Sequence, residues 1–185
     1  MCFNGHFNFF RAGINLMREQ EYGRLIMVGS TSGLLGNIGQ ANYGAAKMGI
    51  AGLSRIVAME STSKGITCNV ICPSADTRMT RSVPTPKDPA VAAEREERLK
   101  RSRADAIAPL ITFLASENAG YVNGQIFHQR AGELSVYSHP RPTRMVHQNG
   151  GWTPESIKEV AMPSLANQFY DIASSRSVHP GMPLD

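Results

Sequence analysis

Two short apolar runs place the strongest limit on how this chain can fold. The first, residues 25–28, reads Leu-Ile-Met-Val without alternation and enters a cluster of Gly, Ser and Thr; the second, residues 66–72, is closed by Pro73. Unbroken apolar strands are typical of parallel sheets that are covered on both faces. Parallel neighbours need a crossover connection, which is usually a helix. The two runs therefore predict an α/β fold.

Helices are expected around these strands. Apolar residues recur every three or four positions over residues 3–19 and 41–63, which is the helical period. We also expect a helix over 106–116, a third strand over 124–127, and a last short helix with Thr153 as N-cap and Pro154 in its first turn. The alternation of strand and helix predicts a partial Rossmann-like parallel sheet of about three strands, flanked by helices.

Composition suits one soluble globular domain. The chain has 185 residues, of which 42% are hydrophobic and 18% charged. Its net charge of +4 is spread along the sequence, which argues against nucleic acid as a partner. No apolar run reaches the ~20 residues that cross a bilayer. The amino terminus carries polar residues where a signal peptide would be apolar. We therefore expect no membrane association and a cytoplasmic protein.

The cysteines and histidines do not form a metal or disulfide pattern. Cys2, Cys68 and Cys72 are an odd set, so all three are expected to be thiols in a reducing compartment. Cys68 and Cys72 are expected to be small core residues. The histidines at positions 6, 128, 139, 147 and 179 are scattered, and we expect no metal.

Residues 94–101 alternate acidic and basic side chains. Glu94, Glu96 and Glu97 each precede a basic residue by four positions, a spacing that supports an exposed helix. A solvated helix face is the preferred interpretation, and a phosphate-binding patch is the alternative.

Ser30, Tyr43 and Lys47 form the candidate catalytic group. Tyr43 and Lys47 are four residues apart on the long helix, so their side chains share one face. A tyrosine with its ordinary pKa of ~10 is a poor base at neutral pH, but a fixed ammonium beside it favours the phenolate. Ser30 lies where the first strand ends, and its hydroxyl could bind a substrate carbonyl. Taken alone, Tyr-x-x-x-Lys is a weak signal, because exposed pairs of this kind are common on helices.

Alternative motifs are weaker. Residues 29–33 read G-x-T-x-G and not the G-x-S-x-G of a hydrolase. Gly33, Gly36 and Gly39 follow a strand and precede a helix, but their even spacing differs from the dinucleotide-binding G-x-G-x-x-G. We interpret these glycines as part of an active-site loop.

The surrounding sequence strongly resembles the short-chain dehydrogenase/reductase family. The resemblance rests on Gly-Ser-Thr-Ser-Gly at 29–33, Gly-Asn-Ile-Gly-Gln-Ala-Asn-Tyr-Gly-Ala-Ala-Lys at 36–47 and Ile-Thr-Cys-Asn-Val-Ile-Cys-Pro at 66–73. It covers residues 3–127 and is closest to the hydroxyacyl-CoA dehydrogenase units of multifunctional β-oxidation enzymes and to related bacterial dehydrogenases. It implies that residues 1–132 are the catalytic part of a Rossmann-like domain and residues 133–185 a C-terminal extension.

The resemblance also implies roles for individual residues. Ser30 would orient the substrate oxygen, Tyr43 would be the general acid/base, and Lys47 would bind the nicotinamide ribose and lower the tyrosine pKa. In the loop after the second strand, Pro73, Ser74 and Thr77 would contact the cofactor, with Ser74 in place of the family's usual glycine. The implied reaction moves a hydride between NAD or NADP and a secondary alcohol or ketone, such as a 3-hydroxyacyl-CoA or a steroid-like substrate.

One part of the family pattern is absent from the sequence. The family begins with a strand and a Gly-rich turn that hold the cofactor's pyrophosphate, and nothing of that kind precedes Phe3. We expect the nucleotide-binding half to be missing, which would leave residues 25–28 as an apolar sheet edge. A homo-oligomer through helices 3–19 and 41–63, a separate partner chain or a longer natural protein would each cover that edge. The alternative function is a non-enzymatic remnant or interaction subunit that cannot bind a dinucleotide alone.

Overall fold

The computed structural model describes residues 2–178, so that Met1 and residues 179–185, with His179 and the end of the expected extension, lie outside the described part. The side chains of Cys2 and Arg176 are outside it as well. Contacts divide the chain into two compact units, one formed by the residues up to Tyr137 together with those from Ala173 onward, and the other by Ser138–Ile172. The expected boundary after residue 132 stays a prediction.

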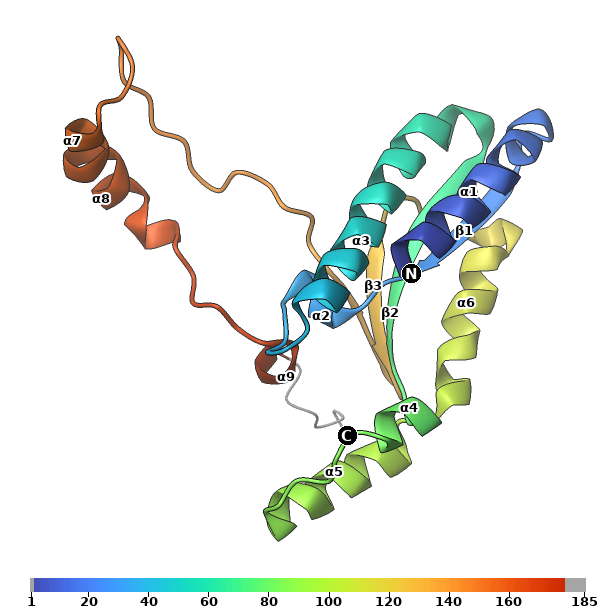
Figure 1. Cartoon of the computed structure of the whole chain (residues 1–185). Helices are drawn as coiled ribbons and strands as arrows, with labels where there is room; N and C mark the ends of the chain where they lie inside the picture. The colour runs from blue at the N-terminus through green and yellow to red at the C-terminus, as the bar shows by residue number, and fades with distance from the viewer. Residues whose placement is uncertain (1, 179–185) are drawn as a thin grey trace. The chain divides into compact units, whose positions relative to one another are not determined.

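A four-stranded sheet forms the centre of the larger unit (Figure 1). Its strands are β1 (Gly23–Val28), β2 (Ile66–Ser74), β3 (Ile126–Arg130) and β4 (Glu133–Val136), in that order across the sheet. The first three are parallel, and β4 pairs antiparallel with β3. This architecture confirms the α/β class and the parallel pairing of the strands predicted from sequence.

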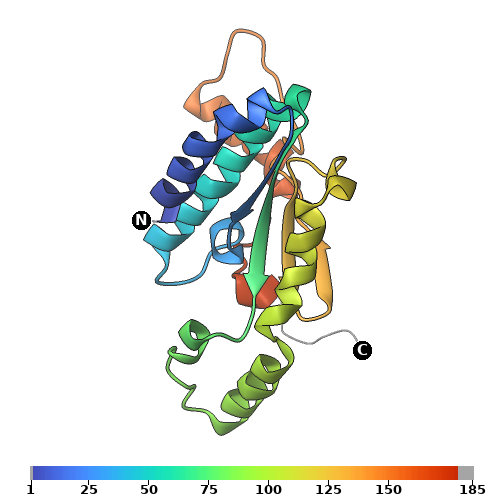
Figure 2. The same cartoon turned by 90° about the vertical axis from the view of Figure 1, so that its right-hand side faces the viewer.

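Helices cover both faces of the sheet (Figure 2). The helices α1 (Cys2–Glu19) and α3 (Ala41–Ser61) lie on one face and α6 (Ala108–Ala115) on the other. Alternate side chains of β2 enter the two cores: Cys68, Val70 and Cys72 pack with α3, and Ile71 packs with α6. Burial on both faces explains why β2 reads as an apolar run. The apolar run of β1 is less buried, with Met27 4% and Val28 40% exposed, because β1 lies at the edge of the described sheet.

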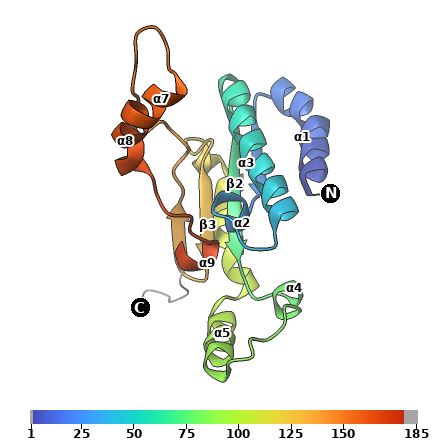
Figure 3. The same ribbon diagram turned by 60° about the vertical axis from the view of Figure 1, so that its left-hand side comes forward.

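Short helices follow the carboxyl ends of the strands. The four-residue helix α2 (Thr31–Leu34) follows β1, and the four-residue helix α4 (Arg78–Arg81) follows β2, before the longer helix α5 (Pro89–Arg101). The short helix α9 (Ser175–Val178) lies beside α2 (Figure 3), where the amide of Ser175 donates a hydrogen bond to the carbonyl of Gly36 (3.0 Å). Short 3-10 segments occupy Thr62–Lys64, Ala104–Ile107 and Glu117–Ala119.

The structure departs from the sequence prediction at the ends of two strands. β2 continues through Pro73 to Ser74, because its last pair with β1 is at Ile71 and a proline is tolerated where a strand has one free side. The third strand begins two residues later than expected, because Gly124 turns the chain at a φ of 71°. It then runs on to Arg130 and turns back at Ala131, which gives the unexpected strand β4.

The smaller unit, Ser138–Ile172, contains one irregular helical segment. It comprises α7 (Pro154–Ser156), a π-helical turn (Ile157–Ala161), α8 (Met162–Leu165) and a 3-10 turn (Ala166–Gln168). Thr153 caps α7 and its hydroxyl accepts from the amide of Ser156, as predicted for this short helix. Pro163 lacks an amide proton, so the helical hydrogen-bond ladder is interrupted just after the π-helical turn. Across residues 2–178, no helix combines the length and the apolar character that crossing a membrane requires.

Replacing Ile50 by Ala should destabilise the larger unit. Ile50 is 0% exposed and belongs to the core between α3 and the sheet. A cavity there should lower the free energy of unfolding by ~2–5 kcal/mol in urea titrations. Ile38, which is fully exposed, is the matched control, and its replacement by Ala should change the free energy of unfolding by less than ~0.5 kcal/mol. Equal losses at both positions would contradict the assigned core.

Candidate active site

A cavity of about 780 Å³ opens at the carboxyl ends of the parallel strands. Ligand sites of open α/β sheets lie at this edge. The lining comes from several elements: Ser30 and Ser32 near the start of α2, Tyr43 and Lys47 of α3, Pro73 and Ser74 at the end of β2, Thr77 and Thr80 at α4, Arg95 and Arg98 of α5, and His128 and Arg130 of β3. The residues singled out from the sequence therefore share one cavity.

Ser30 sits at the turn from β1 into α2. Its backbone is extended, with a φ of −165°, and its hydroxyl oxygen accepts a hydrogen bond from the amide of Ser32 (3.2 Å), which caps the helix. The hydroxyl proton of Ser30 is left to donate. This arrangement suits a group that donates to an oxygen atom in the cavity.

Lys47 is held at the end of β1. Its side chain is 8% exposed, and Nζ donates a hydrogen bond to the carbonyl of Val28 (2.8 Å). The same ammonium lies 5.7 Å from the centre of the Tyr43 ring. Tyr43 is 36% exposed, so its ring borders the cavity while Lys47 lies beneath it. The Tyr-x-x-x-Lys spacing thus places a fixed positive charge beside a phenol.

Gly33 allows α2 to pack closely against Lys47. A Cβ atom at Gly33 would lie 2.8 Å from the Cβ of Lys47 and 2.8 Å from the amide nitrogen of Met48. Gly36 and Gly39 instead turn the chain between α2 and α3, with φ values of 95° and 79°. All three glycines therefore serve the loop between Ser30 and Tyr43.

The loop after β2 forms the facing side of the cavity. Ser74 Oγ and His128 Nε2 are 3.1 Å apart, so this side chain is anchored to β3. Thr77 is the N-cap of α4 in a capping box: its hydroxyl accepts from the amide of Thr80 (3.2 Å), and the Thr80 hydroxyl accepts from the amide of Thr77 (2.7 Å). Pro73, Ser74 and Thr77 all line the cavity.

Two lining residues on β3 were missed from the sequence. His128 is 2% exposed and Arg130 is 9% exposed. The Arg130 guanidinium donates to both carboxylate oxygens of Glu133 on β4, at 2.8 and 2.6 Å from Nη2. Both residues lie beyond the strand end expected at 127. The signal that could have found them is the alternation of Ile126, His128 and Arg130, which are buried in turn along β3.

The charged helix α5 presents one side to the cavity. Arg95 and Arg98 line it, whereas Lys100 pairs with Glu97 (2.8 Å) on the exposed side. Glu96, expected to support the helix through a partner four residues on, instead contacts Arg81 (3.6 Å). α5 is therefore not only a solvated helix.

The lining is positively charged. Its charged side chains are Lys47, Arg95, Arg98 and Arg130, of which Arg130 is compensated by its ion pair with Glu133 on β4, and no lining residue in the described part of the chain is an aspartate or glutamate. A cavity lined by one sign of charge concentrates ligands of the opposite sign. The site is suited to an anionic ligand.

Cys68 and Cys72 are buried core thiols beneath the site. Burial raises the pKa of Cys72 to about 12, an effect that the nearby positive charge of Lys47 partly offsets. Burial likewise raises the pKa of Cys68 to about 11. These groups stay protonated near neutral pH and do not act as nucleophiles. Within residues 2–178, no three His, Cys, Asp or Glu side chains are grouped so that they could hold a metal ion.

The chain is similar in sequence to a known family profile and to known proteins. Residues 1–132 match the family profile described as enoyl-(acyl carrier protein) reductase. The chain is 38% identical over 94% of its length to peroxisomal multifunctional enzyme A of Dictyostelium discoideum, of which it covers 37%. It is also 38% identical over 70% of its length to 3-oxoacyl-(acyl-carrier-protein) reductase of Escherichia coli, of which it covers 53%.

A solved structure agrees with these relatives. A short chain dehydrogenase from Mycobacterium avium superposes with a TM-score of 0.73 and 30% identity, covering 93% of this chain and 56% of that one. The chain thus spans about a third to just over half of the proteins it matches here.

Replacing Gly33 by Ala should destabilise the site locally. The added methyl group would press on Lys47 and on the backbone of α3, which should lower the free energy of unfolding by ~1–3 kcal/mol in urea titrations. Gly52 is the matched control, because nothing lies within 4 Å of a Cβ there. Since it is inside α3, Gly52→Ala should raise the free energy of unfolding by ~0.5–1 kcal/mol. A gain in stability at both positions would contradict the close packing of α2 on α3.

Proposed function

The chain belongs to the short-chain dehydrogenase/reductase family, and from this premise we propose that it transfers a hydride between NAD(P) and the carbinol carbon of a secondary alcohol, or in reverse to a ketone. The observation that carries the proposal is that Ser30, Tyr43 and Lys47 line one cavity, with the ammonium 5.7 Å from the phenol ring. A hydroxyl donor, a proton acceptor and a fixed cation are the groups that this reaction requires.

We propose the following roles for the three residues. Ser30 donates a hydrogen bond from its hydroxyl to the substrate oxygen and so holds that oxygen near the phenol. Tyr43 takes the proton of the substrate hydroxyl during oxidation and returns a proton to the oxygen during reduction. The positive charge of Lys47, anchored by Val28, stabilises the negative charge that develops on the phenolic oxygen during the transfer.

The lining residues fit a nicotinamide cofactor. A cavity of about 780 Å³ lies in the size range of cofactor sites, and its cationic lining suits a ligand with phosphates. Pro73, Ser74 and Thr77 would contact the cofactor on one side, and Tyr43 and Lys47 its ribose on the other. When bound, the nicotinamide ring supplies the hydride acceptor or donor. The residue that selects between NAD and NADP follows a G-x-G-x-x-G turn in this fold. This sequence contains no such turn, so the proposal covers both cofactors.

For the substrate, we propose an acyl thioester of the 3-hydroxyacyl or 3-oxoacyl type, with a steroid-like alcohol as the second class. The name of the Escherichia coli relative, 3-oxoacyl-(acyl-carrier-protein) reductase, supports the first class. The cationic lining supports it as well, because such thioesters are carried on groups that contain phosphate. Among the proposed substrates, this charge favours an anionic molecule over a neutral sterol.

A homo-oligomer through α1 and α3 is the proposed assembly, and the cytoplasm is the proposed compartment. Large apolar side chains are exposed on these two helices: Phe9 (86%), Leu16 (64%), Ile56 (51%) and Met59 (71%). Apolar surface of this kind is typical of protein interfaces. Sedimentation velocity should therefore show a species larger than 20.1 kDa, and Met59→Glu should shift it toward the monomer. A monomer at all concentrations would contradict this assembly.

Replacing Tyr43 by Phe should abolish turnover while leaving the cavity intact. Loss of the phenolic hydroxyl removes the proton acceptor, so kcat should fall by ~10²–10⁴ with little change in KM. Nicotinamide fluorescence titration measures cofactor binding separately, and Tyr43→Phe should still bind. Tyr121→Phe is the matched control, because that ring is 83% exposed and away from the cavity lining.

Two outcomes would contradict this function. If the purified chain binds no NAD or NADP at millimolar concentration, the alternative of a non-enzymatic interaction subunit is favoured. If the chain turns over equally well with Phe at position 43, another group is the proton acceptor.

A further inference from the structure

The helix that Thr77 caps is too short to be stable without tertiary contacts. α4 consists of four residues, Arg78–Arg81, with Thr77 as its N-cap. A single helical turn is unstable in isolation, because nucleating a helix costs more than one turn of hydrogen bonds recovers. The orientation of Thr77 toward the cavity must therefore depend on contacts that α4 makes with other parts of the chain.

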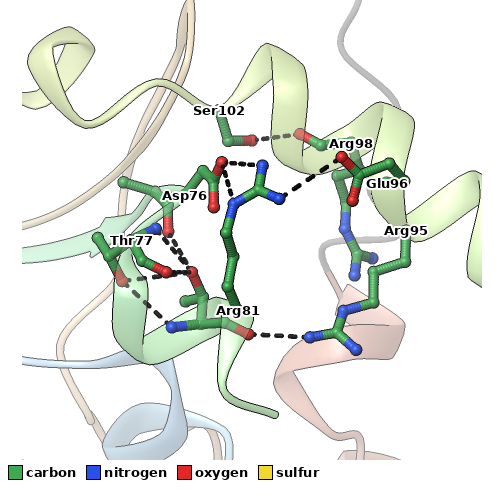
Figure 4. Close-up of polar contacts among 9 residues, drawn as sticks. Asp76, Thr77, Arg81, Arg95, Glu96, Arg98 and Ser102 are labelled. Carbon is green, nitrogen blue, oxygen red and sulfur yellow. Dashed lines mark hydrogen bonds and ion pairs between the residues drawn. The ribbon is translucent and has the colours of Figure 1, made fainter. Parts of the chain in front are cut away.

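Arg81 provides the central contact (Figure 4). Its Nε and Nη2 donate to the same carboxylate oxygen of Asp76, at 2.9 and 2.5 Å, and its Nη1 lies 3.6 Å from a carboxylate oxygen of Glu96 on α5. The side chain of Asp76 is 19% exposed, while those of Arg81 and Glu96 are about half exposed, at 49% and 48%. Asp76 directly precedes Thr77, so this chain of charges runs from the candidate cofactor loop to α5.

Backbone contacts complete the attachment. The amide of Asp76 donates to the carbonyl of Ser102 at the end of α5 (2.6 Å). Arg95 of α5 donates from Nη2 to the carbonyl of Thr80 (2.9 Å), and it also reaches the carbonyls of Val83 and Pro84. Figure 4 shows Arg81 and Arg95 reaching across the space between α4 and α5 in opposite directions. α4 and α5 are thus fastened together, and their residues Thr80, Arg95 and Arg98 form one part of the cavity wall.

We infer that Asp76, Arg81 and Glu96 form an ion-pair clamp whose role is to position Thr77 and the α4–α5 wall against the bound nucleotide. This inference rests on the proposed function, since it assigns Thr77 to the cofactor. None of the three residues lines the cavity, so they are positioning residues that act through Thr77 and Arg95. The Arg81–Glu96 pair is about half exposed at both ends, so it contributes little to the stability of the whole fold. The Asp76 side chain is more buried, at 19% exposed, so the KM and exchange measurements are what separate a positioning role from a purely structural one.

The test replaces Arg81 by Gln in the full chain. Breaking the clamp should raise the KM for the nicotinamide nucleotide roughly tenfold and change kcat less than about threefold, because binding geometry is lost while Tyr43 is untouched. Arg81→Lys keeps the charge without the forked donors and should fall between Arg81→Gln and the unchanged chain. The matched control is Lys100→Gln, which removes an exposed ion pair with Glu97 on the outer side of α5 and should leave KM unchanged.

Hydrogen exchange gives a readout that needs no turnover. The amides of Arg81 and Ser82 donate to the carbonyls of Thr77 and Arg78, and in Arg81→Gln they should exchange roughly tenfold faster. Core amides of β2 should keep their rates. Unchanged exchange at positions 81 and 82, or an equal rise of KM in Lys100→Gln, would overturn the clamp. If the unchanged chain neither binds nucleotide nor turns over, the proposed function fails, and the exchange rates still decide whether the clamp holds the wall.

Discussion

The hydrogen bond from Lys47 to the carbonyl of Val28 is the contact on which the rest of the site depends. It joins Lys47, in the second turn of α3, to Val28, the last residue of β1, so a helix and a strand meet at one buried ammonium. A buried charge without a partner would be costly, and the carbonyl supplies part of that compensation. The bond also fixes the distance between the charge and the Tyr43 ring, which lies on the same helix one turn earlier.

The neighbouring elements follow from this fixed point. Gly33 lets α2 lie against the backbone at Lys47, which brings Ser30 to the same cavity. The opposite wall is built differently, from the short helix α4 and the charged helix α5, held together by side-chain contacts more than by a core. One side of the cavity is therefore set by close packing and the other by ion pairs and carbonyl contacts, which are weaker and more easily opened.

Much of this arrangement could be predicted from the sequence, because the buried elements carry periodic patterns. The apolar run at 66–72 and the helical spacing around Ile50 reflect burial, which determines residue type, and the run at 25–28 is partly buried. Tyr43 and Lys47 are four positions apart, so their proximity follows from helix geometry alone. Ser30 joins them because the carboxyl end of a parallel strand and the following helix share one edge.

The parts that could not be predicted depend on contacts between distant charged residues. Arg130 lies beyond the strand end expected at residue 127, and its burial depends on its ion pair with Glu133. Glu96 was expected to stabilise its own helix, but its partner is fifteen residues earlier, at Arg81. Sequence spacing does not predict such ion pairs, because they form only when the fold brings two distant segments of the chain together.

β1 lies at one edge of the described sheet, and this position decides where a further strand could add residues to the cavity. Any strand that paired in parallel with β1 would end beside Ser30, because parallel strands share the direction of their carboxyl ends. The opposite edge offers no equivalent place, since β4 runs the other way. A strand added to this sheet by another polypeptide would therefore reach the cavity on the β1 side, and its terminal residues would become part of the cavity wall.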